Sequence, residues 1–289
     1  MATSYTCLSL RFLSVAAITL TIAILLPSCK TPEELAIDKR DQVFVAGGND
    51  KKTKKPGTSG GTASYQSVDR GWNPSVSAPR GGTGNKLSYS RVSVSEPYVA
   101  MTFDDGPHPV NTPRLLDILK ARNIKATFYV VGTNATSYPH ILRRMIAEGH
   151  EIGNHTKTHA YLTKISAAAV RSEMGFTHRA IVQATGVPPK TMRPPYGATN
   201  SGLRTRIKQE FGYPSIMWAV DPQDWKRPGS QVVANRIVSA TTKGAIILAH
   251  DIHAPTITAM PNALDRLLAK GYKFVTVTQL IALGEGGAE

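Results

Sequence analysis

Two adjacent carboxylates, Asp104 and Asp105, stand out as residues that could do chemistry. They follow an apolar, strand-like segment at 98–103, and Gly106 and Pro107 then turn the chain. Neighbouring residues on a strand point in opposite directions, so the two carboxylates can perform different tasks if the turn brings both into one cleft. One would suit a metal ligand and the other a general base. A polar turn that caps the next helix is the simpler alternative.

A pair of imidazoles could complete a metal site. His155 and His159 are spaced i and i+4, one turn apart in a helix. Two imidazoles and a carboxylate can bind zinc at about 2.0–2.2 Å and leave a position open for water. Position 156 is threonine, so the glutamate of a His-Glu-x-x-His metalloprotease is absent and Asp104 is the available base. On spacing alone, ordinary surface or core histidines are the alternative.

Alternating strand-like and helix-like segments must position these groups. Strands are expected at 98–103, 126–131, 151–154, 191–193, 215–220, 245–249 and 273–277. Helices are expected at 112–119, 139–148, 166–185, 201–211, 231–240, 261–270 and 278–283. Repeated strand-helix units imply parallel strands covered by helices. About seven units fall short of the ~250 residues of an eight-unit barrel, so we expect an α/β fold with a distorted or incomplete (β/α) barrel. An open doubly wound sheet is the alternative.

Polar residues follow five of the expected strands. They are Asp104, Asp105, His155, His159, Arg193, Asp221, Asp224 and His250. The carboxyl ends of parallel strands meet at one face, where such folds carry their reactive groups. One polar strand end is commonly a turn, whereas five indicate a single site.

The N-terminal segments indicate export. An uncharged apolar run at 12–26 follows Arg11 and is shorter than the ~20 residues of a membrane-spanning helix. Leu-Pro-Ser-Cys at 26–29 resembles a bacterial lipobox, although Pro27 replaces the usual small residue. We therefore expect residues 1–29 to be a signal peptide with a lipobox, and Cys29 to carry a lipid anchor in the membrane. Ordinary signal cleavage or an uncleaved anchor are the alternatives.

Composition divides the remaining chain and limits its partners. Residues 30–86 are rich in Gly, Ser, Thr, Lys and Pro and predict a flexible polar linker, which leaves 87–289 as the folded domain.

The net charge of +14 favours anionic surroundings, but no basic segment is interleaved with aromatic residues, so we expect no nucleic-acid partner. The two cysteines, Cys7 and Cys29, offer neither a domain disulfide nor zinc-finger spacing.

Five ordered motifs carry a family resemblance. The stretches 102–107, 155–159, 193–197, 221–225 and 248–250 resemble those of the NodB-homology polysaccharide deacetylases, and the resemblance covers residues 98–283. The stretches 218–226 and 247–253 most resemble the peptidoglycan N-acetylglucosamine deacetylases. Lys157 departs from the aromatic residue often found between the two histidines.

The resemblance implies a divalent metal and its ligands. Asp105, His155 and His159 would bind zinc, with cobalt, nickel or manganese as alternatives. Asp104 would be the general base, and Arg193 would orient it and keep it ionised.

The resemblance also implies the acid and the substrate contacts. His250 would protonate the leaving amine, and Asp221, in preference to Asp224, would hold its imidazolium. The backbone N–H of Tyr196 would stabilise the oxyanion. Leu248 and Trp225 would shape the pocket for the acetyl methyl group.

These inferences combine into one functional hypothesis. We expect a metal-dependent N-deacetylase of N-acetylglucosamine in a polysaccharide, peptidoglycan in preference to chitin-type oligomers, located in the bacterial cell envelope. An O-acetyl esterase acting on xylan-like glycan is the enzymatic alternative. A catalytically silent wall-binding lipoprotein is the alternative outside enzymes.

Overall fold

A computed structural model describes residues 86–285. The predicted signal peptide lies outside the described residues, and so does the predicted linker except for its last position. Among the described residues, no helix combines the length and apolarity needed to cross a membrane.

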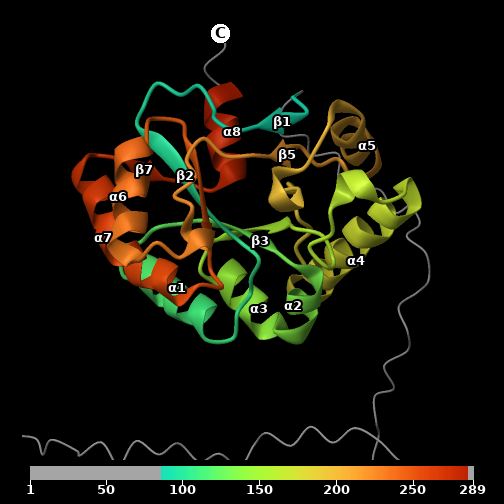
Figure 1. Cartoon of the computed structure of the whole chain (residues 1–289), viewed down its shortest axis with the longest axis horizontal. Coiled ribbons are helices and arrows are strands. Elements are labelled where there is room, and N and C mark those ends of the chain that lie inside the picture. The colour runs from blue at the N-terminus through green and yellow to red at the C-terminus, as the bar shows by residue number, and fades with distance from the viewer. Residues whose placement is uncertain (1–85, 286–289) are drawn as a thin grey trace, which may run out of the picture. The chain divides into compact units, whose positions relative to one another are not determined.

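Strands and helices alternate along the described chain (Figure 1). The strands are β1 Ser88–Tyr89, β2 Tyr98–Asp104, β3 Thr127–Val130, β4 Glu151–Asn154, β5 Ser215–Ile216, β6 Ile246–His250 and β7 Lys273–Phe274. The helices are α1 Asn111–Lys120, α2 Gly132–Ser137, α3 Pro139–Ala147, α4 Ala167–Thr185, α5 Ser201–Phe211, α6 Ser230–Ala240, α7 Ala254–Ala269 and α8 Val277–Glu285. Three short 3₁₀ turns, η2 Leu162–Lys164, η3 Pro195–Gly197 and η4 Asp224–Lys226, lie in the loops between them.

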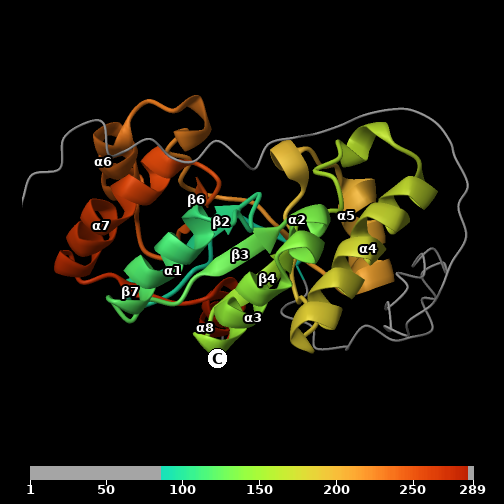
Figure 2. The ribbon, with the colours of Figure 1, turned by 90° about the horizontal axis from the view of Figure 1, so that it is seen from below.

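The central sheet is parallel. Its strands run in the order β4-β3-β2-β6, with β7 paired to the beginning of β2. Figure 2 shows α1, α6 and α7 beside β2 and β6, whereas α4 and α5 lie beyond β4. The predicted α/β fold with parallel strands is therefore confirmed.

Alternation along β2 decides which way its residues face. Val99, Met101 and Phe103 pack into the apolar core shared with α1 and α7. Ala100 belongs instead to the core on the other side, which contains buried residues of α8. Thr102 and Asp104 continue that second series, so the last residue of the strand carries a carboxylate into the interior.

The distorted or incomplete barrel stays a prediction, because the structure shows regular strand pairing for only part of a circuit. Instead of the strand expected at 191–193, Met192 forms single bridges to Asn154 and Ser215. The strand expected at 215–220 ends at Ile216, and Val220 forms a single bridge to Ile247.

Two helices differ from the sequence prediction. Helix α7 begins at Ala254, seven residues before Pro261, although a proline inside a helix lacks one backbone donor. Helix α2 was not predicted, because Gly-Thr-Asn-Ala-Thr-Ser consists mainly of weak helix formers. Its first backbone N–H, on Gly132, donates to the carbonyl of Thr156 at 2.8 Å, so tertiary contacts hold the turn.

A buried histidine at the amino end of β4 makes the fold sensitive to pH. The backbone N–H of Ala126 donates to Nδ1 of His150 at 3.1 Å, which requires the neutral ring. Burial lowers the pKa of His150 to about 4, and the charge of Lys125 adds to the effect. In the unfolded chain the ordinary pKa is about 6.5. The neutral ring therefore contributes stability that is present above pH 6.5 and is lost as the pH falls toward 4.

We expect His150→Asn to reduce this loss, because an amide oxygen can replace Nδ1 as acceptor and does not protonate. Between pH 7.5 and 4.5, the wild-type free energy of unfolding should fall by up to about 3 kcal/mol more than that of the variant. Urea unfolding of both proteins at the two pH values measures the difference. Equal losses would show that His150 does not titrate on unfolding.

Candidate active site

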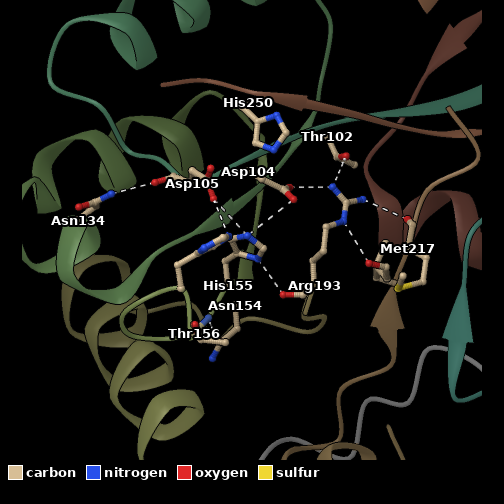
Figure 3. A network of polar contacts seen from close by, with 12 residues as sticks. Thr102, Asp104, Asp105, Asn134, Asn154, His155, Thr156, Arg193, Met217 and His250 are labelled. Atoms are coloured by element: carbon tan, nitrogen blue, oxygen red, sulfur yellow. Dashed lines mark hydrogen bonds and ion pairs between the residues drawn. The ribbon is translucent and has the colours of Figure 1, made fainter. Parts of the chain in front are cut away.

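A buried ion pair between Arg193 and Asp104 lies next to the predicted metal ligands (Figure 3). Arg193 has no exposed surface, and its Nη1 donates to Oδ1 of Asp104 and to the hydroxyl of Thr102, both at 2.7 Å. Its Nε and Nη2 donate to the carbonyls of Ile216 and Met217 at 3.1 and 3.2 Å. A buried guanidinium is tolerated only when its charge and donors are matched in this way. The pair leaves Oδ2 of Asp104 facing the histidines.

Three side chains from two loops meet next to Asp104. Oδ1 of Asp105 lies 3.3 Å from Nε2 of His155 and 3.3 Å from Nε2 of His159. The three ligand atoms all lie within 4.8 Å of one another. Oδ1 of Asp105 is also buried without a hydrogen bond of good geometry. Two imidazole nitrogens and one orphaned carboxylate oxygen are a donor set that fits a divalent cation.

Neighbouring groups orient these ligands. Nδ1 of His155 contacts the carbonyl of Arg193 at 2.8 Å and must donate to it, which leaves the Nε2 lone pair for a metal. The side-chain amide of Asn134 donates to the carbonyl of Asp105 at 2.8 Å. Oδ1 of Asn154 accepts the backbone N–H of Thr156 at 2.9 Å. Each ligand loop is therefore tied to a helix or strand beside it.

Strained backbone gathers at this site. Asp105, Thr156, His159 and Tyr196 have φ values of 75°, 67°, 59° and 60°. Non-glycine residues rarely adopt this left-handed region, and such strain persists only where surrounding contacts impose it. His155 and His159 do not lie in a helix. A turn through Thr156 instead brings their rings to 5.0 Å.

The charges of the site favour ligation. Burial alone would raise the pKa of Asp105, but the surrounding imidazoles of His155, His250 and His159 outweigh it and hold that pKa well below its usual range. Burial lowers the pKa of His159, and the neighbouring His155 lowers it further. An ionised carboxylate and a neutral imidazole are the forms that bind metal.

His250 lies across the carboxylates from His155 (Figure 3) and belongs to a second ion pair. Nδ1 of His250 contacts Oδ1 of the buried Asp224 at 2.8 Å. Oδ2 of Asp224 also accepts the backbone N–H of His250 and the hydroxyl of Thr256, each at 2.8 Å. Burial would lower the pKa of His250, but the hydrogen bond and charge of Asp224 outweigh it and raise the pKa to about 9.

The expectation that Asp221 supports His250 is corrected. Asp221 is exposed, and its Oδ1 accepts the backbone N–H of Gln223 at 2.7 Å. Gln223 has a φ of 55°, which starts the 3₁₀ turn η4 and directs Asp224 inward. Both aspartates follow the same strand-like segment, and the turn at Gln223 brings Asp224 rather than Asp221 against His250.

The other residues predicted from the sequence, Leu248, Tyr196 and Trp225, differ in exposure. Leu248 is buried in β6, whereas Tyr196 and Trp225 are 64% and 50% exposed. The ring of His253 lies 6.0 Å from that of His250. Asp251 is fully buried, and its carboxylate accepts the hydroxyl of Thr112 at 2.5 Å.

Four supporting residues were not predicted. They are Thr102, Asn134, Asn154 and Thr256. Thr102 lies two residues before Asp104, and Asn154 directly precedes His155. Their positions in the sequence could therefore have indicated a supporting role. Asn134 and Thr256 reach the site from helices α2 and α7, and no sequence spacing indicates that contact.

Comparison with known proteins identifies the family. Residues 91–216 match the polysaccharide deacetylase family. A chitooligosaccharide deacetylase from Bradyrhizobium sp. is 38% identical over 198 residues, which cover 63% of this chain and 90% of the relative. The chain belongs to the polysaccharide deacetylase family. The predicted NodB-type family resemblance is thus confirmed.

Other members of the deacetylase family share both sequence and structure with the chain. Peptidoglycan-N-acetylglucosamine deacetylase PgdA from Listeria monocytogenes is 42% identical over 182 residues, which cover 63% of this chain but only 38% of PgdA. The solved structure of peptidoglycan deacetylase PdaC from Bacillus subtilis matches 68% of this chain and 95% of the solved chain, with a TM-score of 0.63 and 35% identity. The chain thus spans about two fifths of the length of the first curated relatives that it matches.

We expect His159→Ala in this deacetylase-family protein to lower zinc affinity by at least about 100-fold, because it removes one of three ligands. His253→Ala should leave the affinity within about twofold, since His253 lies outside the ligand group. Competition with a chromophoric chelator measures both. Comparable losses in the two variants would place the metal elsewhere.

We expect Asp224→Asn to lower the pKa of His250 from about 9 toward 6.5, because the charge that stabilises the imidazolium is removed. Histidine NMR titration of metal-free protein measures it without turnover. Asp221→Asn, a matched change three residues away, should leave the pKa of His250 unaltered. A larger shift in Asp221→Asn would reverse our assignment.

Proposed function

We propose that this protein hydrolytically removes N-acetyl groups from N-acetylglucosamine residues of a cell-envelope polysaccharide, peptidoglycan in preference to chitin-type oligomers. The observation that carries the proposal is the placement of Asp104 and His250, neighbours on the paired strands β2 and β6, next to the Asp105–His155–His159 cluster. Family membership and the names of the relatives support the same chemistry.

The cluster is proposed to hold zinc, with cobalt, nickel or manganese as substitutes. When bound, such an ion would supply Lewis acidity toward the acetamide carbonyl and toward water. The neutral imidazoles and the ionised Asp105 described above are the residues that would hold it.

The base in this proposal is Asp104. Its Oδ1 accepts a hydrogen bond from Arg193 at 2.7 Å, which fixes the orientation of the carboxylate. Its Oδ2 lies 3.8 Å from Nε2 of His155, so it faces the same space as the ligand atoms. There it would take a proton from the attacking water.

The acid is His250. Hydrolysis breaks the C–N bond and releases acetate and a free amine, and an amine leaves only when its nitrogen gains a proton. With a pKa of about 9, His250 is protonated at neutral pH and can supply that proton. The backbone N–H of Tyr196 would stabilise the oxyanion, and Leu248 and Trp225 would bound the acetyl pocket.

This requirement for an acid favours amide over ester hydrolysis. An alkoxide leaving group depends less on protonation than an amine does. The Asp224–His250 pair therefore suits N-deacetylation better than the esterase alternative.

The proposal includes location. The apolar run at 12–26 and the Leu-Pro-Ser-Cys sequence at 26–29 support export and lipid anchoring at Cys29 in the cell envelope. Residues 30–86 would then be a tether and 87–289 the catalytic domain.

We expect the full chain, loaded with zinc, to release acetate and an equal amount of new free amine from peptidoglycan and from N-acetylglucosamine oligomers. A chelator should abolish release. Asp104→Asn should reduce the rate by about 10²–10⁴-fold, because the base is lost, while the exposed Asp221→Asn should not. Thermal unfolding and metal binding of each variant control for folding.

Other outcomes identify the alternatives. Acetate without amine would indicate an O-acetyl esterase. No acetate from any substrate, with metal bound and the domain folded, would support the silent wall-binding protein.

A further inference from the structure

A row of aromatic rings leads outward from the metal cluster. The ring of Tyr196 packs edge-on against His159, with centroids 4.5 Å apart. Tyr161 stacks on Tyr196 at 5.2 Å and an interplanar angle of 21°. The ammonium of Lys164 lies over the Tyr161 ring, 4.4 Å from its centroid. Three successive contacts therefore connect a ligand histidine to one fixed positive charge.

The segment that bears this charge is anchored to an apolar cluster by the residue Leu162. Leu162 is buried and packs in the same apolar cluster as Met192. The backbone N–H of Lys164 donates to the carbonyl of Tyr161 at 2.9 Å, closing the 3₁₀ turn η2. Lys164 itself is exposed, and no carboxylate among the described residues forms an ion pair with it.

A similar arrangement lies on the His250 side. The ammonium of Lys226 is 4.9 Å from the ring centroid of Trp225. The backbone N–H of Trp225 donates to Asp224 at 3.0 Å, and Asp224 holds His250. Lys226 also donates to the side chain of Gln223 at 3.4 Å. A second positive charge is thus attached to the element that supports the acid.

Contact between a lysine and an aromatic ring does not by itself indicate a site. The ammonium of Lys273 lies 5.4 Å from the ring of Tyr98, which is at the start of β2 and six positions before Asp104. Nζ of Lys273 forms an ion pair with Oε2 of Glu96 at 2.9 Å. Lys164 and Lys226 differ because Tyr161 is connected to His159 through Tyr196 and Trp225 is bonded through its backbone to Asp224. In addition, no carboxylate among the described residues pairs with either lysine.

We infer that Lys164 and Lys226 recognise carboxylates on the sugars that flank the reactive N-acetylated sugar, so that the site selects an acidic glycan. The inference rests on the proposed function and names the substrate class of that site. An aromatic face holds an ammonium in place and reduces the side-chain entropy lost on binding. Tyr161 is therefore a positioning residue for Lys164.

The test uses one glycan in two charge states. Peptide-free strands, in which N-acetylated sugars alternate with sugars bearing a lactyl carboxylate, are compared with the same strands after conversion of the carboxylates to neutral methylamides. The full-length wild type should show kcat/KM about tenfold higher on the acidic strands at low salt. The preference should shrink at about 0.5 M salt, because exposed charges are screened.

Four variants locate the preference. Lys164→Met and Lys226→Met should each raise KM about threefold on acidic strands only, with kcat unchanged, because exposed ion pairs contribute little individually. Tyr161→Leu should reproduce Lys164→Met, whereas Tyr161→Phe retains the stacked ring and should behave as wild type. The matched control is Lys273→Met, which removes a lysine charge from β7, beside the start of β2. This variant should keep the preference for acidic strands.

Binding of both strand preparations to each protein, measured by calorimetry, separates recognition from turnover. Equal wild-type binding of the two strands overturns the inference, as does an equal loss in Lys273→Met. A binding preference that depends on Lys164 and Lys226, without acetate release, supports the inference while contradicting the proposed function.

Discussion

The buried pair between Arg193 and Asp104 is the constraint on which the site depends. A guanidinium without exposed surface must find a countercharge and hydrogen-bond acceptors inside the domain, and its four bonds reach β2, Ile216 and Met217. The ring of Tyr129 lies 4.4 Å from the guanidinium carbon and covers one face. These contacts link the middle of the sheet to the loop after β5 and hold the carboxylate at the end of β2 in one orientation.

The same residue also orients a candidate metal ligand. Its side chain holds Asp104, while its backbone carbonyl accepts from Nδ1 of His155 and leaves Nε2 free. Because one residue positions both the base and a ligand, their separation cannot change independently. The left-handed backbone at Asp105 and His159 brings the other two ligand atoms to the same place. Stability elsewhere in the domain offsets that local strain.

The acid side is built from a different part of the chain. Asp224 accepts hydrogen bonds from β6 and from Thr256 in α7, so the orientation of His250 depends on the packing of that helix. The site therefore has two halves, one on β2 and β4 and the other on β6, joined where Asp104 pairs with His250. Each half also carries an exposed aromatic ring with a lysine over it.

The sequence by itself determined the alternation of strands and helices, the parallel sheet, and the residue types that follow each strand, since these depend on local periodicity and on turn residues. It also carried the family motifs. Tertiary structure alone decided that Asp224, and not Asp221, holds His250, because the choice depends on the left-handed backbone at Gln223 and on Thr256, which is 32 residues away. It likewise decided that Arg193 points inward and that Tyr161 stacks on Tyr196. Side-chain direction in irregular loops is set by individual dihedral angles and distant partners, and no sequence period encodes either.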